Sequence, residues 1–417
     1  MIVAPGFVVV KFLPHRSPAA AGRADYPSRR LLRNPVLMPS RRWWFGVAVA
    51  SVVATAPTFA QTRYFPPPGD GWLPRPAGLG GVDSVRLATA VAFAQAADNG
   101  WPTDINAQLK IQTAKEPYPE ILGPVKDRAL TNGVIIKGGY LVAEWGDTRQ
   151  VDMTFSVAKS YLSAVAGLAY DRKLIPDLHE PEGRLITDGG FDGAHNAKIT
   201  WHMHLNQTSE WEGTLWDKPD VADRRLGYDR SLKDPGTVWE YNDVRVNRLA
   251  LSLLRLFRKP LPDVFREAIA RPIGMSDPWV WHGYRNAYVE IDGVRMPSVS
   301  GGGHWGAGFW ASTRDHARFG LLLLRRGEWN GNRILSEDWI DRALVPTPLR
   351  PAYGYMWWLN TERKQFPAAS ARSFFALGSG GNIIWVDPER DLVVVIRWFD
   401  LSRTNEFIRL VSEAVAP

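Results

Sequence analysis

The sequence predicts an α/β protein in which an antiparallel sheet flanked by helices is joined to a mostly helical subdomain. Two β-hairpin patterns at opposite ends of the chain indicate one sheet that contains segments from both ends. Between them, residues 156–345 are dominated by helical periodicity, which predicts the subdomain. We expect a cleft between the two parts, and such clefts usually hold the active site.

The first hairpin pattern consists of two apolar, β-branched runs on either side of Gly138-Gly139. In the second, residues 383–386 and 392–396 flank the turn-forming segment 387–391. Helical patterns predict helices at residues 84–99, 156–171, 246–257, 261–270, 314–326, 337–343 and 404–415. We expect the last of these helices to lie on the sheet.

Charge is distributed unevenly along the 417 residues. Residues 1–60 contain eight Lys or Arg and one acid, whereas residues 61–417 contain equal numbers of basic and acidic residues. A body without net charge lacks the basic surface that nucleic acid requires, so we expect no nucleic-acid partner. The chain has no cysteine, which excludes disulfides, thiolate nucleophiles and Cys-ligated metals.

Residues 38–60 are typical of a signal peptide, with Arg41-Arg42 before an apolar stretch and small residues before the end at Ala60. The stretch is shorter than the about 20 residues of a spanning helix, so no stable membrane span is expected after cleavage. The predicted location is periplasmic or secreted. A partial twin-arginine pattern leaves the export route open, and an uncleaved membrane anchor is the alternative.

Three further boundaries follow from the composition. We expect the natural start at Met38, so that residues 1–37 are an upstream extension. Residues 61–119 form a Pro-rich arm and an N-terminal helical segment, and Pro in the arm favours extended backbone over the surface. Residues 120–417 form the main domain.

Ser156 precedes Lys159 by three residues at the head of a strongly apolar helical pattern. Positions i and i+3 of a helix share a face, so the two side chains can meet. Burial of the helix would lower the pKa of the lysine and make a neutral amine available as a base. A lysine that extends from a helix end into solvent is the alternative.

Two other segments carry chemistry. Tyr241 lies between a turn and a predicted helix, where nearby ammonium groups would favour a phenolate that accepts the serine proton and passes it to a leaving group. The alternative is a core tyrosine with a bonded hydroxyl. Gly378-Ser379-Gly380 leads into a strand, where glycines let a substrate approach and a backbone N–H can form half of an oxyanion hole. The alternative is an ordinary glycine turn.

Together these elements resemble the serine hydrolase family of class C β-lactamases, penicillin-binding carboxypeptidases, type VIII esterases and 6-aminohexanoate-dimer hydrolases. The resemblance covers about residues 120–400, including the hairpin before Ser156 and the segments 199–209, 301–303, 311–320 and 386–391. It implies a β-lactamase-like (serine transpeptidase-type) fold for the hydrolase domain 120–417.

The resemblance also implies roles for individual residues. Ser156 would be the acylated nucleophile, Lys159 its activating neighbour and Tyr241 the general base and acid. The backbone N–H groups of Ser156 and Ser379 would hold the oxyanion.

The chain departs from the family pattern in two places. Where the family commonly has Tyr-x-Asn, this chain has Tyr241-Asn242-Asp243, and Asp243 is predicted to pair with Lys159 and raise its pKa, which favours Tyr241 as the base. Where β-lactamases carry a cationic triplet, this chain has glycines around Ser379 and no cation for a β-lactam carboxylate. This favours neutral esters and linear amides, unless a loop arginine such as Arg372 supplies the charge.

The sequence argues against several other chemistries. His202 and His204 would point the same way on a strand, but Asn206 and Gln207 stand where a metallo-β-lactamase pattern would continue with metal ligands. The chain also lacks a Gly-x-Ser-x-Gly elbow and a nucleotide-binding glycine motif after a strand. No metal and no organic cofactor are therefore expected. Four tryptophans either line a cleft or belong to the core, namely Trp279, Trp281, Trp305 and Trp310.

The sequence thus predicts an exported serine hydrolase that cleaves ester or amide bonds through an acyl-enzyme on Ser156. Its expected partner is a small ester, amide or peptide substrate, and the oligomeric state is left open. Two alternatives remain: a catalytically silent protein of the same fold that binds peptidoglycan fragments or a partner, and a true β-lactamase or D-Ala-D-Ala carboxypeptidase.

Overall fold

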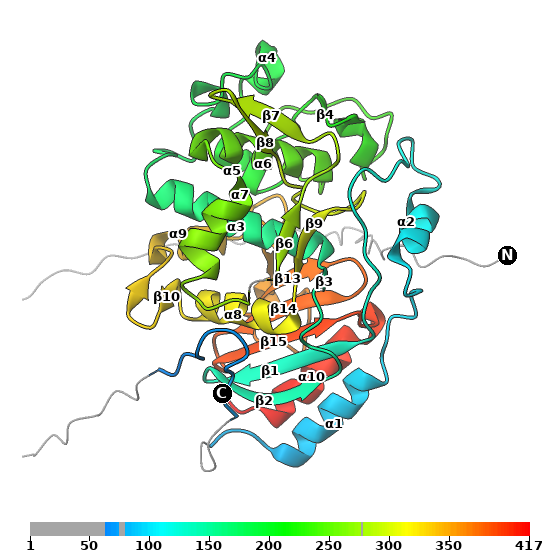
Figure 1. Cartoon of the computed structure of the whole chain (residues 1–417), viewed down its shortest axis with the longest axis vertical. Coiled ribbons are helices and arrows are strands. Elements are labelled where there is room, and N and C mark those ends of the chain that lie inside the picture. The colour runs from blue at the N-terminus through cyan, green and yellow to red at the C-terminus, as the bar shows by residue number, and fades with distance from the viewer. Residues whose placement is uncertain (1–62, 75–79, 277) are drawn as a thin grey trace, which may run out of the picture. The chain divides into compact units, whose positions relative to one another are not determined.

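The computed structural model describes residues 63–74, 80–276 and 278–417 (Figure 1). The chain divides into two units, Met1–Ala60 and Gln61–Pro417. The predicted upstream extension and signal peptide lie outside the described residues.

A six-stranded sheet forms the centre of the second unit, with strand order β12-β13-β14-β15-β1-β2. All neighbouring strands are antiparallel. The strands are β1 (Asn132–Lys137), β2 (Tyr140–Trp145), β12 (Trp358–Leu359), β13 (Phe374–Gly378), β14 (Asn382–Asp387) and β15 (Leu392–Arg397). β1 pairs with β15, Val134 opposite Val395, so the two predicted hairpins do form one sheet.

Helices cover both faces of this sheet. Successive side chains of a strand point to opposite faces, and here both sets are largely apolar, so both faces must be buried. On one face, α1 (Ser84–Gln95) lies beside α10 (Thr404–Ala414), and Phe407 packs in one core with Trp385 and Val394 (Figure 1). The opposite face packs against α8 (Thr313–Leu324). A Cβ on Gly320 of α8 would lie 2.6 Å from Val393 Cγ1, so this glycine allows the close approach of helix and sheet.

Between β2 and β12 the chain builds the mostly helical part. Its helices are α3 (Ala158–Asp171), α4 (Gly193–Asn196), α5 (Trp201–Leu205), α6 (Asp243–Phe257), α7 (Leu261–Phe265), α8 and α9 (Glu337–Ala343). Short strands pair as β3 (Asp152–Met153), β9 (Gly308–Ala311) and β6 (Val280–His282), as β4 (Thr214–Leu215) with β5 (Lys218–Pro219), as β7 (Tyr288–Ile291) with β8 (Val294–Pro297), and as β10 (Glu328–Trp329) with β11 (Asn332–Arg333). The remaining helix, α2 (Ile105–Thr113), precedes β1, and the 3-10 turns are η1 (Phe155–Val157), η2 (Glu182–Arg184), η3 (Asp220–Asp223), η5 (Thr361–Arg363) and η6 (Leu401–Arg403).

The predicted helices are confirmed, with differences at their ends that have local causes. α6 begins at Asp243, three residues before the predicted start, because the Asn242 side chain accepts hydrogen bonds from the N–H groups of Val244 and Arg245. The helix predicted at 261–270 is α7 followed by a π-helical turn, η4 (Arg266–Ala270).

The described part of the Pro-rich arm is tied to α8. Arg318 is fully buried and donates to the carbonyl of Pro66 at 3.3 Å and to that of Gly69 at 2.5 Å. Trp72 of the arm is also buried, so the arm contributes to the core as well as covering the surface.

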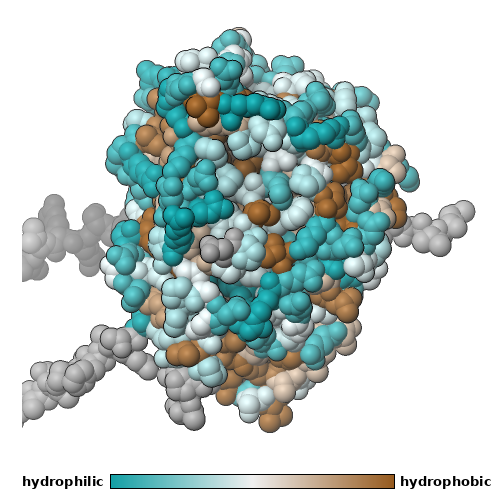
Figure 2. Space-filling view, in the orientation of Figure 1, coloured by the Kyte–Doolittle hydropathy of each residue, from teal (hydrophilic) through white to brown (hydrophobic). Residues whose placement is uncertain are grey.

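On the face shown in Figure 2, hydrophobic residues lie in small patches among hydrophilic ones. No helix within the described ranges is both long and apolar enough to cross a membrane.

Candidate active site

Ser156 lies in the 3-10 turn η1, directly before the buried helix α3. The preceding residue, Phe155, has a φ of 50°, a left-handed conformation that costs about 1–3 kcal/mol for such a side chain. Its ring is buried and makes edge contacts with Trp101 and Trp398, which hold this conformation. Ser156 itself is half-buried, so the turn presents its hydroxyl at the surface of the site.

Lys159 joins Ser156 to a carboxylate from another helix. Its Nζ donates to Ser156 Oγ at 3.0 Å and to Asp243 Oδ1 at 2.5 Å. Both Lys159 and Asp243 are about 1 % exposed. Burial raises the pKa of Asp243, but Lys159, His304 and Arg225 outweigh it and lower the pKa below its usual value. The lysine therefore faces a carboxylate.

Tyr241 lies against the same lysine. Its ring centre is 4.5 Å from Lys159 Nζ and 4.9 Å from Arg225 Cζ. Burial, and next the charge of Asp243, raise the pKa of Tyr241 far above its usual value, against the smaller opposing effects of a Ser156 hydrogen bond and Arg225. The expectation that nearby ammonium groups favour its phenolate is therefore wrong, since burial and Asp243 together favour the neutral phenol.

The segment 206–211 holds Tyr241 and Asp243 in place. The Gln207 carbonyl accepts from the Glu240 N–H at 3.0 Å, and its side-chain Oε1 accepts from the Asn242 N–H at 3.1 Å. Gln207 has a φ of 62° and Glu210 one of 49°, so this segment adopts left-handed turns at two residues. Because of these turns, one short segment contacts the backbone on either side of Tyr241 through Gln207 and also places the Glu210 carboxylate nearby.

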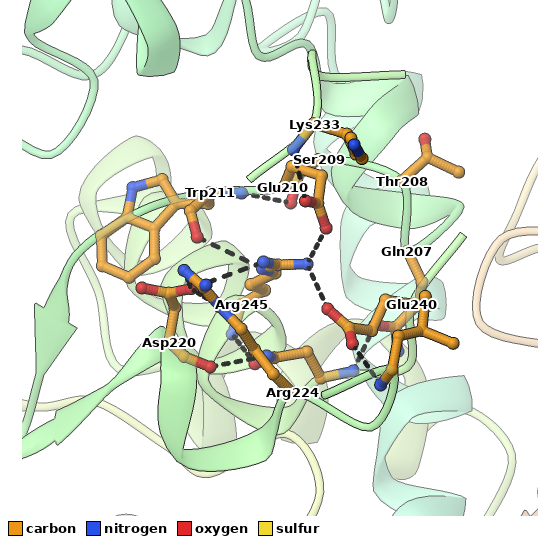
Figure 3. A network of polar contacts seen from close by, with 12 residues as sticks. Gln207, Thr208, Ser209, Glu210, Trp211, Asp220, Arg224, Lys233, Glu240 and Arg245 are labelled. Carbon is orange, nitrogen blue, oxygen red and sulfur yellow. Dashed lines mark hydrogen bonds and ion pairs between the residues drawn. The ribbon is translucent and has the colours of Figure 1, made fainter. Parts of the chain in front are cut away.

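Figure 3 shows the buried charges around this support. Arg245 Nη1 donates to Glu210 Oε1 at 2.7 Å and to Glu240 Oε2 at 3.3 Å. Arg230 contacts both of the same carboxylates, and Arg245 also lies 3.5 Å from Asp220. Despite the opposing effect of burial, Arg230 and Arg245 lower the pKa of Glu210 to about 2. Glu240 directly precedes Tyr241, so this network fixes the tyrosine segment.

The backbone of Gly302 lies against the ion pair of Lys159 and Asp243. A Cβ on Gly302 would lie 2.0 Å from Asp243 Oδ2 and 2.5 Å from Lys159 Nζ. The N–H of His304, two residues after Gly302, donates to Asp243 Oδ2 at 3.3 Å. His304 Nε2 in turn lies 2.8 Å from Glu116 Oε1. Sequence reasoning missed His304 and Glu116, because nothing in the spacing connects residue 116 with residue 304.

Gly378, at the end of β13, packs against η1, the turn that contains Ser156. A Cβ on Gly378 would lie 2.2 Å from the Thr154 carbonyl, and one on Gly380 would lie 2.9 Å from the Trp398 ring. The interpretation that these glycines admit the substrate is therefore incomplete, since close packing of β13 on η1 and on Trp398 requires them. Ser379, between them, is half-buried, and its carbonyl accepts from Asn382 Nδ2 at 2.7 Å.

The edge of β13 is partly open beside Ser156. β12 pairs only with Phe374 and Phe375 at the start of β13. Among the strands described, none pairs with the outer edge of residues 376–378. The last part of β13 therefore reaches Ser156 with a backbone edge that a substrate can approach.

Two other groups of residues identified in the sequence lie outside this site. His202 and His204 are on helix α5 rather than on a strand, so their imidazoles do not share a face: His202 contacts the Tyr355 hydroxyl, and His204 contacts buried Glu182. The four tryptophans belong to the core, with exposed fractions between 0 and 8 %: Trp279, Trp281, Trp305 and Trp310.

Besides Lys159, the site contains a cation that sequence reasoning did not find, Arg225. Arg372 is exposed just before the start of β13, at the opposite end of the strand from Ser379. Arg225 instead lies beside the Tyr241 ring, with its side chain 42 % exposed. The absence of a cation thus holds for residues 378–380 but not for the site as a whole.

The sequence profile of the β-lactamase family matches residues 133–406, which include every residue of this site except Glu116. The chain belongs to the β-lactamase family. The resemblance that the sequence indicates is thus confirmed at the level of the β-lactamase family.

Three solved structures illustrate the β-lactamase fold of the chain. A putative 6-aminohexanoate-dimer hydrolase from Bacillus anthracis is 22 % identical, with a TM-score of 0.51 over 68 % of this chain and 78 % of its own. A putative β-lactamase from Bacteroides dorei is 17 % identical, with a TM-score of 0.51 over 68 % and 92 %. A penicillin-binding protein homologue from Caulobacter crescentus is 14 % identical, with a TM-score of 0.53 over 81 % and 99 %.

Proposed function

We propose that the chain hydrolyses ester or amide bonds through a covalent acyl-enzyme on Ser156. The observation that carries the proposal is the position of Lys159, whose Nζ bridges Ser156 Oγ and Asp243 Oδ1 at 3.0 and 2.5 Å. A buried ammonium beside a half-buried serine has a clear chemical use, since it stabilises negative charge that develops on the attacking oxygen.

In acylation, Ser156 Oγ attacks the substrate carbonyl carbon, and a tetrahedral intermediate forms. Tyr241 accepts the serine proton at its phenolic oxygen as it gives its own proton to the leaving oxygen or nitrogen. The carbon–leaving-group bond then breaks, releasing an alcohol or amine and leaving an ester on Ser156. A neutral phenol suits this relay, because it holds a proton to donate and a lone pair to accept one.

In deacylation, water attacks the ester carbonyl. Tyr241 accepts a water proton and gives its own to Ser156 Oγ, which restores the free enzyme and releases the carboxylic acid. Lys159 keeps its proton throughout, because Asp243 remains its counter-ion. In both steps the N–H groups of Ser156 and Ser379 are proposed to hold the carbonyl oxygen.

Covalent labelling tests this proposal directly. A fluorophosphonate should label the wild-type protein at the peptide that contains Ser156, and Ser156→Ala should abolish labelling and ester hydrolysis with little effect on folding. Ser379→Ala is the matched control, since only its backbone N–H is used, and it should still be labelled. A silent binding protein would not be labelled, and an adduct on another serine would overturn the assignment.

A substrate panel then separates the hydrolase classes. We expect turnover of short-chain p-nitrophenyl esters, since no cation at residues 378–380 is needed to hold a neutral substrate. Linear ω-amide oligomers and D-Ala-D-Ala peptides test the amidase and carboxypeptidase activities. Catalytic efficiency toward nitrocefin above that toward the esters would favour a true β-lactamase.

Export is part of the proposal. Arg41-Arg42, the apolar stretch after them and the small residues before Ala60 support a cleaved signal peptide and a periplasmic or secreted enzyme. The protein recovered from the periplasm of a bacterial host should begin at Gln61. Replacing both arginines by lysine tests the twin-arginine route, and an intact leader in the membrane fraction would favour an anchor instead.

A further inference from the structure

The loop of residues 224–230 is held at both ends by contacts with residues near Tyr241 in space or in sequence. Arg224 Nη2 lies 2.6 Å from buried Asp220 Oδ2, and its Nη1 donates to the Arg230 carbonyl at 2.8 Å, which closes the loop. The Arg230 side chain pairs with Glu210 and Glu240. The Leu226 N–H donates to Glu240 Oε1 at 2.8 Å, one residue from Tyr241. Figure 3 shows Arg224 with Asp220, and the carboxylates of Glu210 and Glu240.

Between these anchors the loop presents Arg225 to the site. Its Nε donates to Asp223 Oδ1 at 3.1 Å and its Nη2 donates to Asp223 Oδ2 at 3.4 Å. Asp223 Oδ2 is itself fixed by the Asp243 N–H at 2.7 Å. Within the part of the chain that the structure describes, Arg225 Nη1 makes no hydrogen bond. The guanidinium is thus held rigidly by one edge, and its other edge is open to a ligand.

The surroundings define what that edge can bind. Leu226 and Tyr228 are exposed by 59 % and 42 % and supply apolar surface next to Arg225. Two neighbouring carboxylates are already paired, since Asp223 contacts Arg225 and Glu116 contacts His304. Such a site suits one carboxylate on an otherwise apolar group and does not suit a polyanion.

Arg225 flanks the residue that handles the leaving group. Its guanidinium lies 4.9 Å from the ring centre of Tyr241, whose hydroxyl gives its proton to the leaving group in the proposed mechanism. The group next to Arg225 is therefore the leaving alcohol or amine and not the acyl part.

We propose that Arg225 binds a carboxylate on the leaving group, so that the preferred substrates are esters or amides of hydroxy or amino carboxylic acids. This inference rests on the proposed hydrolase function and adds its substrate class. It places the anion-binding group on the loop before Tyr241 and not at the Gly378-Ser379-Gly380 strand end.

Two ester substrates that differ in one charge test the proposal: 4-acetoxybenzoate, whose phenolic leaving group carries a carboxylate, and 4-acetoxybenzamide, its neutral counterpart. Arg225→Gln should lower the ratio of their kcat/KM values by about ten- to a hundred-fold relative to wild type, the range of a charge-assisted hydrogen bond. Arg225→Lys should retain part of the ratio. Arg271→Gln, which removes an exposed charge on the turn after η4, should leave the ratio unchanged.

The outcomes separate this proposal from the proposed function. Turnover of both esters with a ratio that Arg225→Gln does not change would overturn the role of Arg225 and leave the hydrolase intact. An equal loss for both esters would place Arg225 in the proton transfer of Tyr241 instead. If wild type turns over neither ester, calorimetric binding of 4-hydroxybenzoate against 4-hydroxybenzamide decides: equal affinity of wild type for the two products overturns the proposal.

Discussion

Gly302 and Asp243 come so close together that a single methyl group on the glycine would lie 2.0 Å from Asp243 Oδ2. The same methyl group would lie 2.5 Å from Lys159 Nζ. The backbone of Gly302 thus covers the buried ion pair that orients the lysine toward Ser156. Gly302 does not have a positive φ, so the space available, rather than the backbone conformation, requires glycine here.

Gly302→Ala should therefore lower kcat by about a hundred-fold or more, because the Lys159–Asp243 pair must move away from Ser156. Steady-state kinetics with a p-nitrophenyl ester gives the measurement. Gly80→Ala is the matched control, since no atom of the residues that the structure describes lies within 4 Å of its added methyl group. Wild-type kcat in Gly302→Ala would show that the position of the ion pair is not critical.

Tyr241→Phe should reduce kcat by about a hundred-fold or more, because it removes the proton relay and keeps the ring. Its neighbour Tyr353 offers a control, since its ring centre lies 6.2 Å from that of Tyr241 and it is also buried. Tyr353→Phe should retain most of the activity. Equal losses in the two variants would mean that the aromatic cluster, rather than one hydroxyl, is required.

Asp243→Asn should change the pH profile more than the maximal rate. The carboxylate raises the pKa of Tyr241, so its neutralisation should let the phenol ionise at lower pH. The alkaline limb of kcat/KM should then move to lower pH, while the amide keeps the shape of the pair with Lys159. An unchanged profile would mean that Asp243 does not act on Tyr241.

His304 should contribute stability that depends on pH. Burial lowers its pKa, but Asp223, Glu116 and Asp243 outweigh burial and raise the pKa above 6.5. The contribution of His304 to the free energy of unfolding is therefore complete below about pH 6.5. It is lost as the pH rises through the higher pKa that His304 has in the folded state. The loss of unfolding free energy in His304→Gln, measured by urea denaturation, should be larger at pH 6 than at pH 9.

His282 provides the control of opposite sign. Burial lowers its pKa, so its contribution is present above about 6.5 and is lost as pH falls. His282→Gln should therefore cost more at pH 9 than at pH 6. The same pH trend in both variants would contradict the assignment of His304 to an ion pair.

Glu210→Gln should lower the free energy of unfolding by about 3 kcal/mol, because it leaves buried Arg245 without one of its carboxylates. The exposed residue Glu212, two positions further on, offers a matched control, and Glu212→Gln should change stability by no more than about 0.5 kcal/mol. Equal unfolding midpoints for the two variants would show that the network around Glu240 tolerates loss of this charge.

The sequence alone determined the features that depend on neighbours along the chain. Turn residues between runs of apolar, β-branched residues predicted both hairpins, and 3.6-residue periodicity predicted the helices, because these signals lie within a few residues of the structure they specify. The Ser156–Lys159 contact was predictable for the same reason, since helix geometry brings positions i and i+3 together.

Only the tertiary structure decided the electrostatics and the packing of the site. Arg225 and Glu116 reach it from loops with no motif, and the protonation state of Tyr241 depends on how burial and Asp243 compare with the nearby cations. The need for Gly378 comes from a carbonyl more than 200 residues away in the chain, that of Thr154. Charge–charge interactions and close contacts depend on distances in space, and spacing along the chain does not encode those distances once the partners lie on different elements.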